Sequence, residues 1–297
     1  MAMTLVEASK LSNDTILQGV IDVVATESDA LQRLPFIEVV GNGWTYNRLD
    51  SAPTAGFYDV GDTWSEDTPT FEQVTAVLKI MGGDADVDQF LAQTRSNIQD
   101  LEAEVLQLKA KAVANLFDDT FINGDEGSDP NSFDGLAAHV TAGQTVSMGT
   151  NGAVLTLDKL DELIDKSRGG KPDVLFMSRR TRRQLNSLAR TSGTFLETDR
   201  DEFGRVLQFY DGIPLGINDY IADDDTVGTS NDCSTIYGVR FSAADGLTGI
   251  TSPGGLQVEN IGPLETKDAH RNRLKWYANI AVLATNSIEK LIGLRAG

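Results

Sequence analysis

A long uninterrupted helix is predicted over residues 87–123, where the sequence contains neither proline nor glycine. Apolar or small residues recur at alternating steps of three and four, a spacing that forms one narrow stripe along a helix. The stripe consists of Leu91, Thr94, Ile98, Leu101, Val105, Leu108 and Ala112. At 1.5 Å per residue the helix would be roughly 50 Å long, more than a compact domain usually needs. It is either a coiled-coil pairing helix or a rod along which a flat, extended subunit is built.

The sequence also contains residues that typically begin or end helices, both at the ends of this helix and in the segment before it. Asp86 or Asp88 can cap the helix start, and the Asn123-Gly124 pair supplies a stop. Near the N-terminus, Ser28 and Asp29 open a short helical turn before Pro35. An earlier helix is predicted after the cap residues 12–14, with its apolar face formed by Ile16, Leu17, Val20, Ile21 and Val24. We expect this N-terminal arm to lie on a neighbouring molecule.

Residues 35–82 change to a strand-like pattern with a long insertion. Strands are predicted at residues 36–40, 44–49 and 71–80. About twenty residues rich in Gly, Pro, Asp and Ser separate the last two strands, yet they include Phe57, Tyr58 and Trp64. A loop of this length is usually functional or disordered, and its aromatic residues favour burial against a surface. The pattern predicts a long hairpin arm that reaches another subunit, or one that folds back on its own core.

The remaining chain predicts a small α/β region followed by closing strands. Turns with Phe133 and Leu136 as anchors lead into two amphipathic helices, residues 157–168 and 179–190. Predicted strands over residues 173–177, 212–217 and 234–241 lie between or after these helices. The last strands, over 256–261, 273–284 and 288–294, are expected to cover the stripe of the long helix.

Charge and composition narrow the class of protein. The 297 residues include 44 acidic and 25 basic side chains, a formal net charge of −19. Such a chain is repelled by phosphate and by anionic membranes, which disfavours sequence-independent nucleic-acid binding but not a container for nucleic acid. One cysteine, Cys233, excludes an internal disulfide. The sequence has no apolar run of membrane length and its first residues lack a signal-peptide core, so we expect a soluble protein made inside the cell.

The sequence predicts no catalytic, cofactor or metal site. His139, His270 and Cys233 are too few for a Cys/His zinc site. Three alternating aspartates, Asp84, Asp86 and Asp88, resemble the start of a calcium loop, but its sixth position is glutamine and its twelfth is arginine. We expect these aspartates to favour the positive end of the following helix instead. An unrecognised pair of carboxylates, as in an acidic hydrolase, remains an alternative.

The strongest basic feature is a cluster at the start of the second amphipathic helix. It consists of Arg179, Arg180, Arg182 and Arg183. Such a cluster either contacts phosphate or an acidic partner, or forms a solvated helix face with local acid pairing. We treat these arginines as candidate inter-subunit charge contacts.

The order of these segments resembles the major capsid protein of tailed bacteriophages, which has the Hong Kong 97 fold. The resemblance spans essentially the whole chain. Its most specific parts are the GD-P-F-GL segment at residues 124–136 and the YDGIP element at residues 210–214. It implies an α+β fold with an N-terminal arm, an extended β-hairpin loop, a spine helix packed on antiparallel strands, and a mixed α/β axial domain.

By this resemblance the chain divides into four parts. Residues 1–34 form the arm, 35–82 the extended loop, 83–124 with 256–297 the peripheral domain, and 125–255 the axial domain. The implied function is non-enzymatic: many copies assemble as pentamers and hexamers into an icosahedral virion shell, in the host bacterial cytoplasm, around double-stranded DNA. The loop residues expected to contact an adjacent subunit are Trp44, Phe57, Tyr58, Trp64 and Phe71.

Two departures from the family affect the expected partners. The chain has no room for the N-terminal scaffolding domain of some members, so we expect either a separate scaffolding protein or none, beside a portal protein and decoration proteins. The loop tip contains no lysine, so the lysine–asparagine crosslink of one member is not expected. The alternative within this fold is an encapsulin-like shell that encloses an enzyme.

Overall fold

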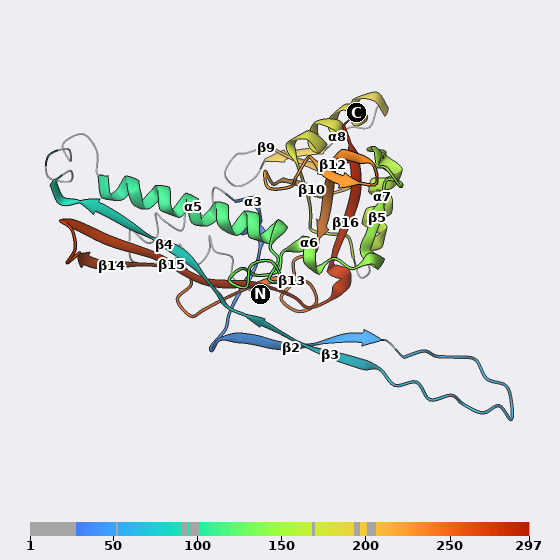
Figure 1. Cartoon of the computed structure of the whole chain (residues 1–297). Helices are drawn as coiled ribbons and strands as arrows, with labels where there is room; N and C mark the ends of the chain where they lie inside the picture. The colour runs from blue at the N-terminus through green and yellow to red at the C-terminus, as the bar shows by residue number, and fades with distance from the viewer. Residues whose placement is uncertain are drawn as a thin grey trace.

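The computed structural model describes residues 28–51, 53–90, 94, 101–167, 170–192, 197–200 and 206–296. A long helix lies across one twisted sheet, a second sheet with its own helices adjoins it, and a two-stranded arm projects from the body (Figure 1). The architecture is therefore α+β, as the sequence predicts.

The first sheet has five strands and carries the long helix. Its strands are β1 (Phe36–Glu38), β13 (Leu247–Thr251), β15 (Ala269–Val282), β14 (Gln257–Pro263) and β4 (Lys79–Asp88). The central strand β15 pairs antiparallel with β13, β14 and β4, and its register with β4 runs from Ala269↔Asp88 to Ala278↔Lys79. The predicted packing of a closing strand on the helix is confirmed for β15, because α5 (Leu101–Asn123) packs with β15 and with β4.

The buried face of α5 differs from the predicted stripe. Phe117 is fully buried, and its ring lies 5.2 Å from Trp276 and 5.7 Å from Phe133. The core-facing residues are Leu106, Ala110, Val113, Ala114, Phe117, Phe121 and Ile122. The predicted stripe residues Leu108 and Ala112 are exposed. The prediction of the buried stripe is wrong because α5 is apolar on two faces, and the aromatic face has the larger area to bury.

The predicted start of the helix at Val87 is two residues too early, because helical residues begin at Gln89, after β4. The predicted cap Asp88 accepts a hydrogen bond from Phe90 N on its Oδ1 at 2.9 Å. Val87 is buried within β4, where Ala85 and Val87 face inward and Asp84 and Asp86 face outward. The outward aspartates pair with β15 instead of a helix end: Arg273 Nε lies 2.6 Å from Asp84 Oδ1 and Arg271 Nε 2.6 Å from Asp86 Oδ1. The alternation of acidic and apolar residues has the period of a strand, not of a helix.

The second sheet has nine strands. They are β5 (Thr145–Ser147), β6 (Ala153–Val154), β7 (Val174–Met177), β8 (Glu197–Arg200), β9 (Val206–Tyr210), β10 (Ile213–Ile217), β11 (Asp225–Val227), β12 (Ser230–Val239) and β16 (Ile288–Arg295). Strand β7 is buried on both faces: Val174 and Phe176 join the α5 core, whereas Leu175 and Met177 join a second core. The two apolar cores therefore meet across β7.

Helices cover the second core as the sequence predicts. Leu160 and Leu163 of α7 (Leu157–Lys166) and Leu185 of α8 (Arg179–Ser192) are fully buried there. The shorter helical segments are α3 (Asp29–Arg33), α6 (Leu136–His139), η1 (Ala142–Gln144) and η2 (Thr285–Ser287). The predicted anchors Phe133 and Leu136 are also buried, and they pack in the α5 core.

The last strand lies in a different place from the predicted one. β16 pairs with β12, β5 and β6 of the nine-stranded sheet, so it does not cover α5 as expected. After β15 the chain turns through η2, and Leu291 and Leu294 then enter the second core. The prediction for residues 288–294 is wrong because an apolar strand pattern does not specify which sheet receives it.

The end of the predicted N-terminal arm is part of the subunit's own core. Ala30, Leu31 and Leu34 are fully buried, and Ser28 Oγ accepts a hydrogen bond from Leu31 N at 3.0 Å, which confirms its role as a cap. The helix predicted over residues 14–24 lies outside the described residues.

Candidate assembly surfaces

The projecting arm is a hairpin of β2 (Gly43–Ser51) and β3 (Thr70–Val77), as predicted. Its strands pair antiparallel from Gly43↔Val77 to Ser51↔Thr70. Side chains link the strands on the exposed stem: the hydroxyls of Thr45 and Thr75 are 2.9 Å apart, and Arg48 Nη2 lies 2.6 Å from Glu72 Oε2. The hairpin leads away from both sheets (Figure 1), and most of the described residues of its tip are exposed.

The tip is ordered by contacts within itself. Asp67 Oδ2 accepts hydrogen bonds from Thr54 N at 2.9 Å and Thr54 Oγ1 at 2.7 Å, and these bonds hold the pKa of the Asp67 carboxyl below its usual value. The rings of Tyr58 and Trp64 stack with centroids 4.4 Å apart, and the Tyr58 hydroxyl is 3.0 Å from Ser65 Oγ. The long loop therefore has a defined conformation, although it contains no regular secondary structure.

Large apolar side chains on the arm are exposed to solvent. The relative exposure is 107% for Phe57, 76% for Trp64 and 68% for Phe71. Covering each such side chain would stabilise a complex by about 1.5–3 kcal/mol before ordering costs are subtracted. This surface can bind another apolar surface.

Two of the five predicted contact residues are partly used within the subunit. Trp44 lies at the base of the arm, its ring 5.2 Å from that of Tyr46, against a small core that contains Val39 and Ile250. Tyr58 is half-buried under the Trp64 ring. The structure therefore places Phe57, Trp64 and Phe71 outward and gives Trp44 and Tyr58 supporting positions.

The four arginines of the predicted basic cluster are not one surface. Arg179 forms a two-point pair with Asp219, with Nε–Oδ1 at 2.5 Å and Nη2–Oδ2 at 2.6 Å, which raises the pKa of its guanidinium. Arg180 lies 3.3 Å from Asp223. Arg182 is half-buried, whereas Arg183 is exposed to solvent.

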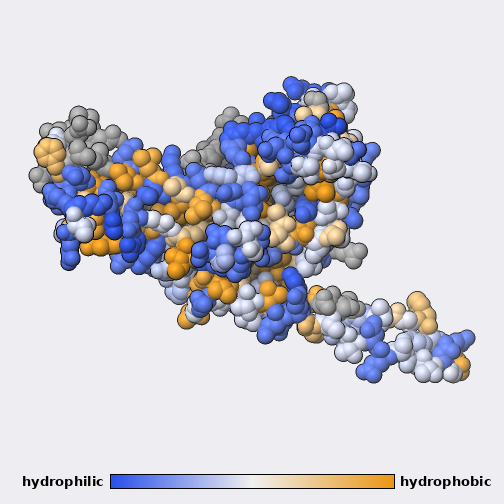
Figure 2. Space-filling view, viewed as in Figure 1, coloured by the Kyte–Doolittle hydropathy of each residue, from blue (hydrophilic) through white to orange (hydrophobic). Residues whose placement is uncertain are grey.

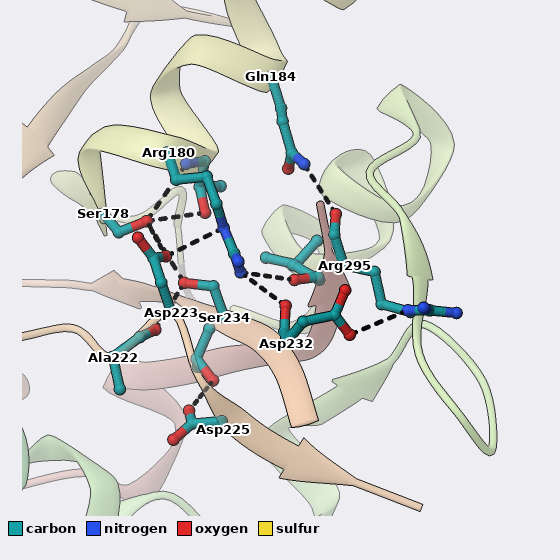
Figure 3. Close-up of polar contacts among 12 residues, drawn as sticks. Ser178, Arg180, Gln184, Ala222, Asp223, Asp225, Asp232, Ser234 and Arg295 are labelled. Carbon is teal, nitrogen blue, oxygen red and sulfur yellow. Dashed lines mark hydrogen bonds and ion pairs between the residues drawn. The ribbon is translucent and has the colours of Figure 1, made fainter. Parts of the chain in front are cut away.

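Arg180 instead belongs to a polar cluster that fixes the C-terminal strand (Figure 3). Its Nη2 donates to the carbonyl oxygens of Asp232 at 2.9 Å and Leu294 at 3.3 Å. Gln184 Nε2 donates to the carbonyl oxygen of Arg295 at 2.7 Å. Helix α8 is thereby tied to the end of β16, which is a structural role that the run of arginines alone does not reveal.

Hydroxyl groups complete this cluster at the start of α8. Ser178 Oγ donates to Asp223 Oδ1 at 2.6 Å and accepts from Thr181 N at 3.2 Å. Ser234 Oγ donates to the carbonyl oxygen of Ala222 at 2.9 Å. Asp223 is the first of three consecutive aspartates at residues 223–225. Ser178 and Asp223 are therefore occupied by these structural bonds.

One buried carboxyl was missed by the sequence analysis. Glu289 has no exposed surface, and neither of its oxygens has a hydrogen-bond partner among the described residues. Burial raises its pKa to about 8, against a smaller opposing effect of Arg240. It lies opposite Gly238 in the β12–β16 pair, and a Cβ at Gly238 would lie 2.6 Å from Glu289 Oε1. Glycine is thus needed there to leave space for the carboxyl.

A groove of about 810 Å³ separates the hairpin stem from α7. Arg48 and Leu49 line one side, and Glu162, Asp165 and Lys166 line another. Both carboxylates are exposed, and Glu162 is paired with Lys159 at 2.6 Å. The two carboxylates of the groove are therefore open to solvent and do not form a buried pair.

In the described part of the chain, no group of three or more His, Cys, Asp or Glu side chains is arranged to hold a metal ion. No helix in the same residues is both long and apolar enough to cross a bilayer. Cys233 is fully buried.

Comparison with known proteins identifies the architecture. The model of the phage capsid family matches residues 11–290. No curated protein matches the sequence. Among solved structures, the SrpI encapsulin of Synechococcus elongatus has a TM-score of 0.73 at 20% identity, over 100% of this chain and 97% of that chain.

Phage-type capsids are similar over almost the same length. The capsid of a native GTA particle has a TM-score of 0.63 at 18% identity, over 91% of this chain and 90% of that chain. A chain of Microbacterium phage Oxtober96 has a TM-score of 0.65 at 17% identity, over 90% and 91%. At these identities the similarity establishes a shared fold, and the predicted capsid fold is confirmed.

Proposed function

This chain belongs to the phage capsid family, and from that membership we propose that it is the major capsid protein of a tailed-phage head. A protein of this family is a structural shell protein and a component of viral capsids, which assemble from many copies. We further propose that the copies form pentamers and hexamers around double-stranded DNA, with a portal protein, a separate scaffolding protein and decoration proteins as partners, and that assembly takes place in the host bacterial cytoplasm.

The exposed aromatic surface of the hairpin is the observation that carries the assembly proposal. Phe57 and Trp64 are large, apolar and unburied on an arm that leaves the body of the subunit. Monomeric proteins rarely leave such side chains in solvent, whereas subunit interfaces are rich in them. We propose that Phe57, Trp64 and Phe71 bind an adjacent subunit, with Tyr58 and Trp44 holding the arm in shape.

A double substitution tests the role of the tip. Phe57→Ser with Trp64→Ser should abolish shell formation because the tip loses its apolar contact, while the subunit stays folded. Negative-stain electron microscopy counts the shells, and circular dichroism checks the fold. Val154→Ser is a matched control, since Val154 is 47% exposed but lies on β6. Normal shells from the double variant would contradict the proposal.

The negative charge of the chain supports a shell that encloses DNA but binds it weakly. With a net charge of −19, the shell wall repels phosphate, so packaged DNA could move during filling and release. We propose enclosure without sequence-specific binding and without enzymatic activity. Arg183 is the member of the basic cluster that is most open to an inter-subunit charge contact.

An encapsulin-like compartment is the second candidate function. The similarity to SrpI encapsulin covers this entire chain, with a TM-score of 0.73. Particles purified from the native source would separate the two candidates. Nuclease-protected double-stranded DNA is expected for the phage head, whereas a stoichiometric enzyme inside DNA-free particles would favour the compartment.

A further inference from the structure

Helix α5 has a second apolar face that the five-stranded sheet does not cover. Leu108 is 58% exposed and Leu116 is 48% exposed, and Ala112 between them is also exposed. Their spacing of four residues places them on one side of the helix, roughly opposite the buried residues Ala110 and Phe117. Hydrophobic side chains are visible at the surface over α5 in Figure 2. We call Leu108, Ala112 and Leu116 the outer stripe.

The described chain begins beside this helix. Ser28 Oγ donates a hydrogen bond to Asp118 Oδ1 of α5 at 2.5 Å, and both residues are buried. Twenty-seven residues precede Ser28. Four residues span at most about 14 Å, and the outer stripe is about 12 Å long. Residue 24 and those before it are therefore within reach of the outer stripe of the same subunit.

The preceding segment has a matching sequence pattern. Residues 14–26 carry five large apolar residues at helical spacing: Ile16, Leu17, Val20, Ile21 and Val24. A helix of this kind is marginal in water without an apolar surface to cover. The sequence pattern and the reach of this segment therefore both agree with the outer stripe.

We propose that the apolar face of residues 14–26 binds the outer stripe of α5 in the same chain. The segment then covers Leu108, Ala112 and Leu116, and α5 is packed on both sides. This contact is separate from the hairpin interface, because it joins two parts of one subunit.

Cysteine crosslinking tests the proposal. Val20→Cys is combined with Ala112→Cys in the full chain, with Cys233→Ala to remove the native thiol, and the dilute subunit is oxidised. Mass spectrometry of the digest should find most of residue 20 linked to residue 112 within single chains. Gln107→Cys replaces Ala112→Cys in the control, since residue 107 lies about 140° around the helix from residue 112. Circular dichroism and elution volume verify that both variants are folded.

The possible outcomes separate the proposed partner from others. A link within one chain that forms at residue 112 and not at residue 107 supports the proposal. Equal linkage at both positions overturns it, and so does linkage only between chains, which would mean that another copy supplies the segment. An unlinked residue 112 also overturns it, whether that thiol reacts with a maleimide or is covered by some other partner.

Discussion

The side chain of Glu289 couples subunit stability to pH. A buried carboxyl without hydrogen bonds is favoured in its neutral form, and its pKa is about 8. In the unfolded chain the same carboxyl ionises near its ordinary value of 4.5. Folding is therefore not opposed by this group below about pH 4.5, and the opposition grows as the pH rises toward 8.

Replacement of this carboxyl should remove the pH effect. Glu289→Gln is expected to raise the free energy of unfolding of the soluble subunit by on the order of 3 kcal/mol at pH 8, and by much less at pH 4.5. Urea unfolding at both values measures the difference. Glu66→Gln on the exposed hairpin tip is the control. An equal effect of Glu289→Gln at both pH values would contradict the assignment.

At the level of single residues, the sequence predicts contacts that depend on local rules but not contacts between distant parts of the chain. The serine cap at Ser28 and the anchors Phe133 and Leu136 could be predicted from local rules. The partners of Arg179 and Arg180 could not, because Asp219 and Asp223 are about forty residues away in the chain. The burial of Glu289 has a weak signal at most, since a glutamate in a strand usually faces solvent.

At the scale of elements, the sequence correctly predicts that α5 is a helix, but the face predicted to be buried is the wrong one. The absence of glycine and proline predicts the helix, and its C-terminal end at Asn123 agrees with the stop signal. Leu101, Val105, Leu108 and Ala112 fit a helical stripe as well as Leu106, Ala110, Val113 and Phe117 do. Only the sheet that packs on α5 decides which stripe is buried, and one helix does not contain that information.

The aromatic face of α5 should dominate the stability of this element. Phe117→Ala is expected to reduce the free energy of unfolding by about 3–5 kcal/mol, since the cavity would lie among Phe36, Phe133 and Trp276. Chemical denaturation of the soluble subunit measures the loss. Gln107→Ala on the exposed side of the same helix should change stability by less than about 0.5 kcal/mol. Similar effects of the two substitutions would be inconsistent with the packing.

For the whole molecule, the order of segments carried more information than any motif. The hairpin, the long helix, the α/β region and the closing strands were predicted in their correct order along the chain. The family match covers residues 11–290. The prediction failed where a strand had a choice of sheets, as β16 does. The division into arm, loop, peripheral and axial domains stays a prediction, and β16 would have to move to the axial part.

The net charge gives a prediction for assembly as a whole. Subunits that each carry a charge of −19 repel one another, and raising salt from 0.1 M to 1 M shortens the screening length from about 10 Å to about 3 Å. Shell formation by the purified subunit should therefore increase with sodium chloride, as followed by light scattering. A decrease with salt would show that attractive charge pairs between subunits outweigh the general repulsion.

The junction between the arm and the body has a mechanical consequence. Strands β3 and β4 are separated by Leu78 alone, so one nearly continuous length of chain runs from the tip into the sheet beneath α5. Polar contacts clamp this junction: Asn279 Nδ2 donates to Val77 O at 2.7 Å, and Lys79 Nζ lies 2.8 Å from Glu126 Oε1. A force that pulls on the tip is therefore transmitted along the ten paired residues of β4. The arm is thus expected to resist this force through the strand pairing of the sheet, rather than to bend freely at its base.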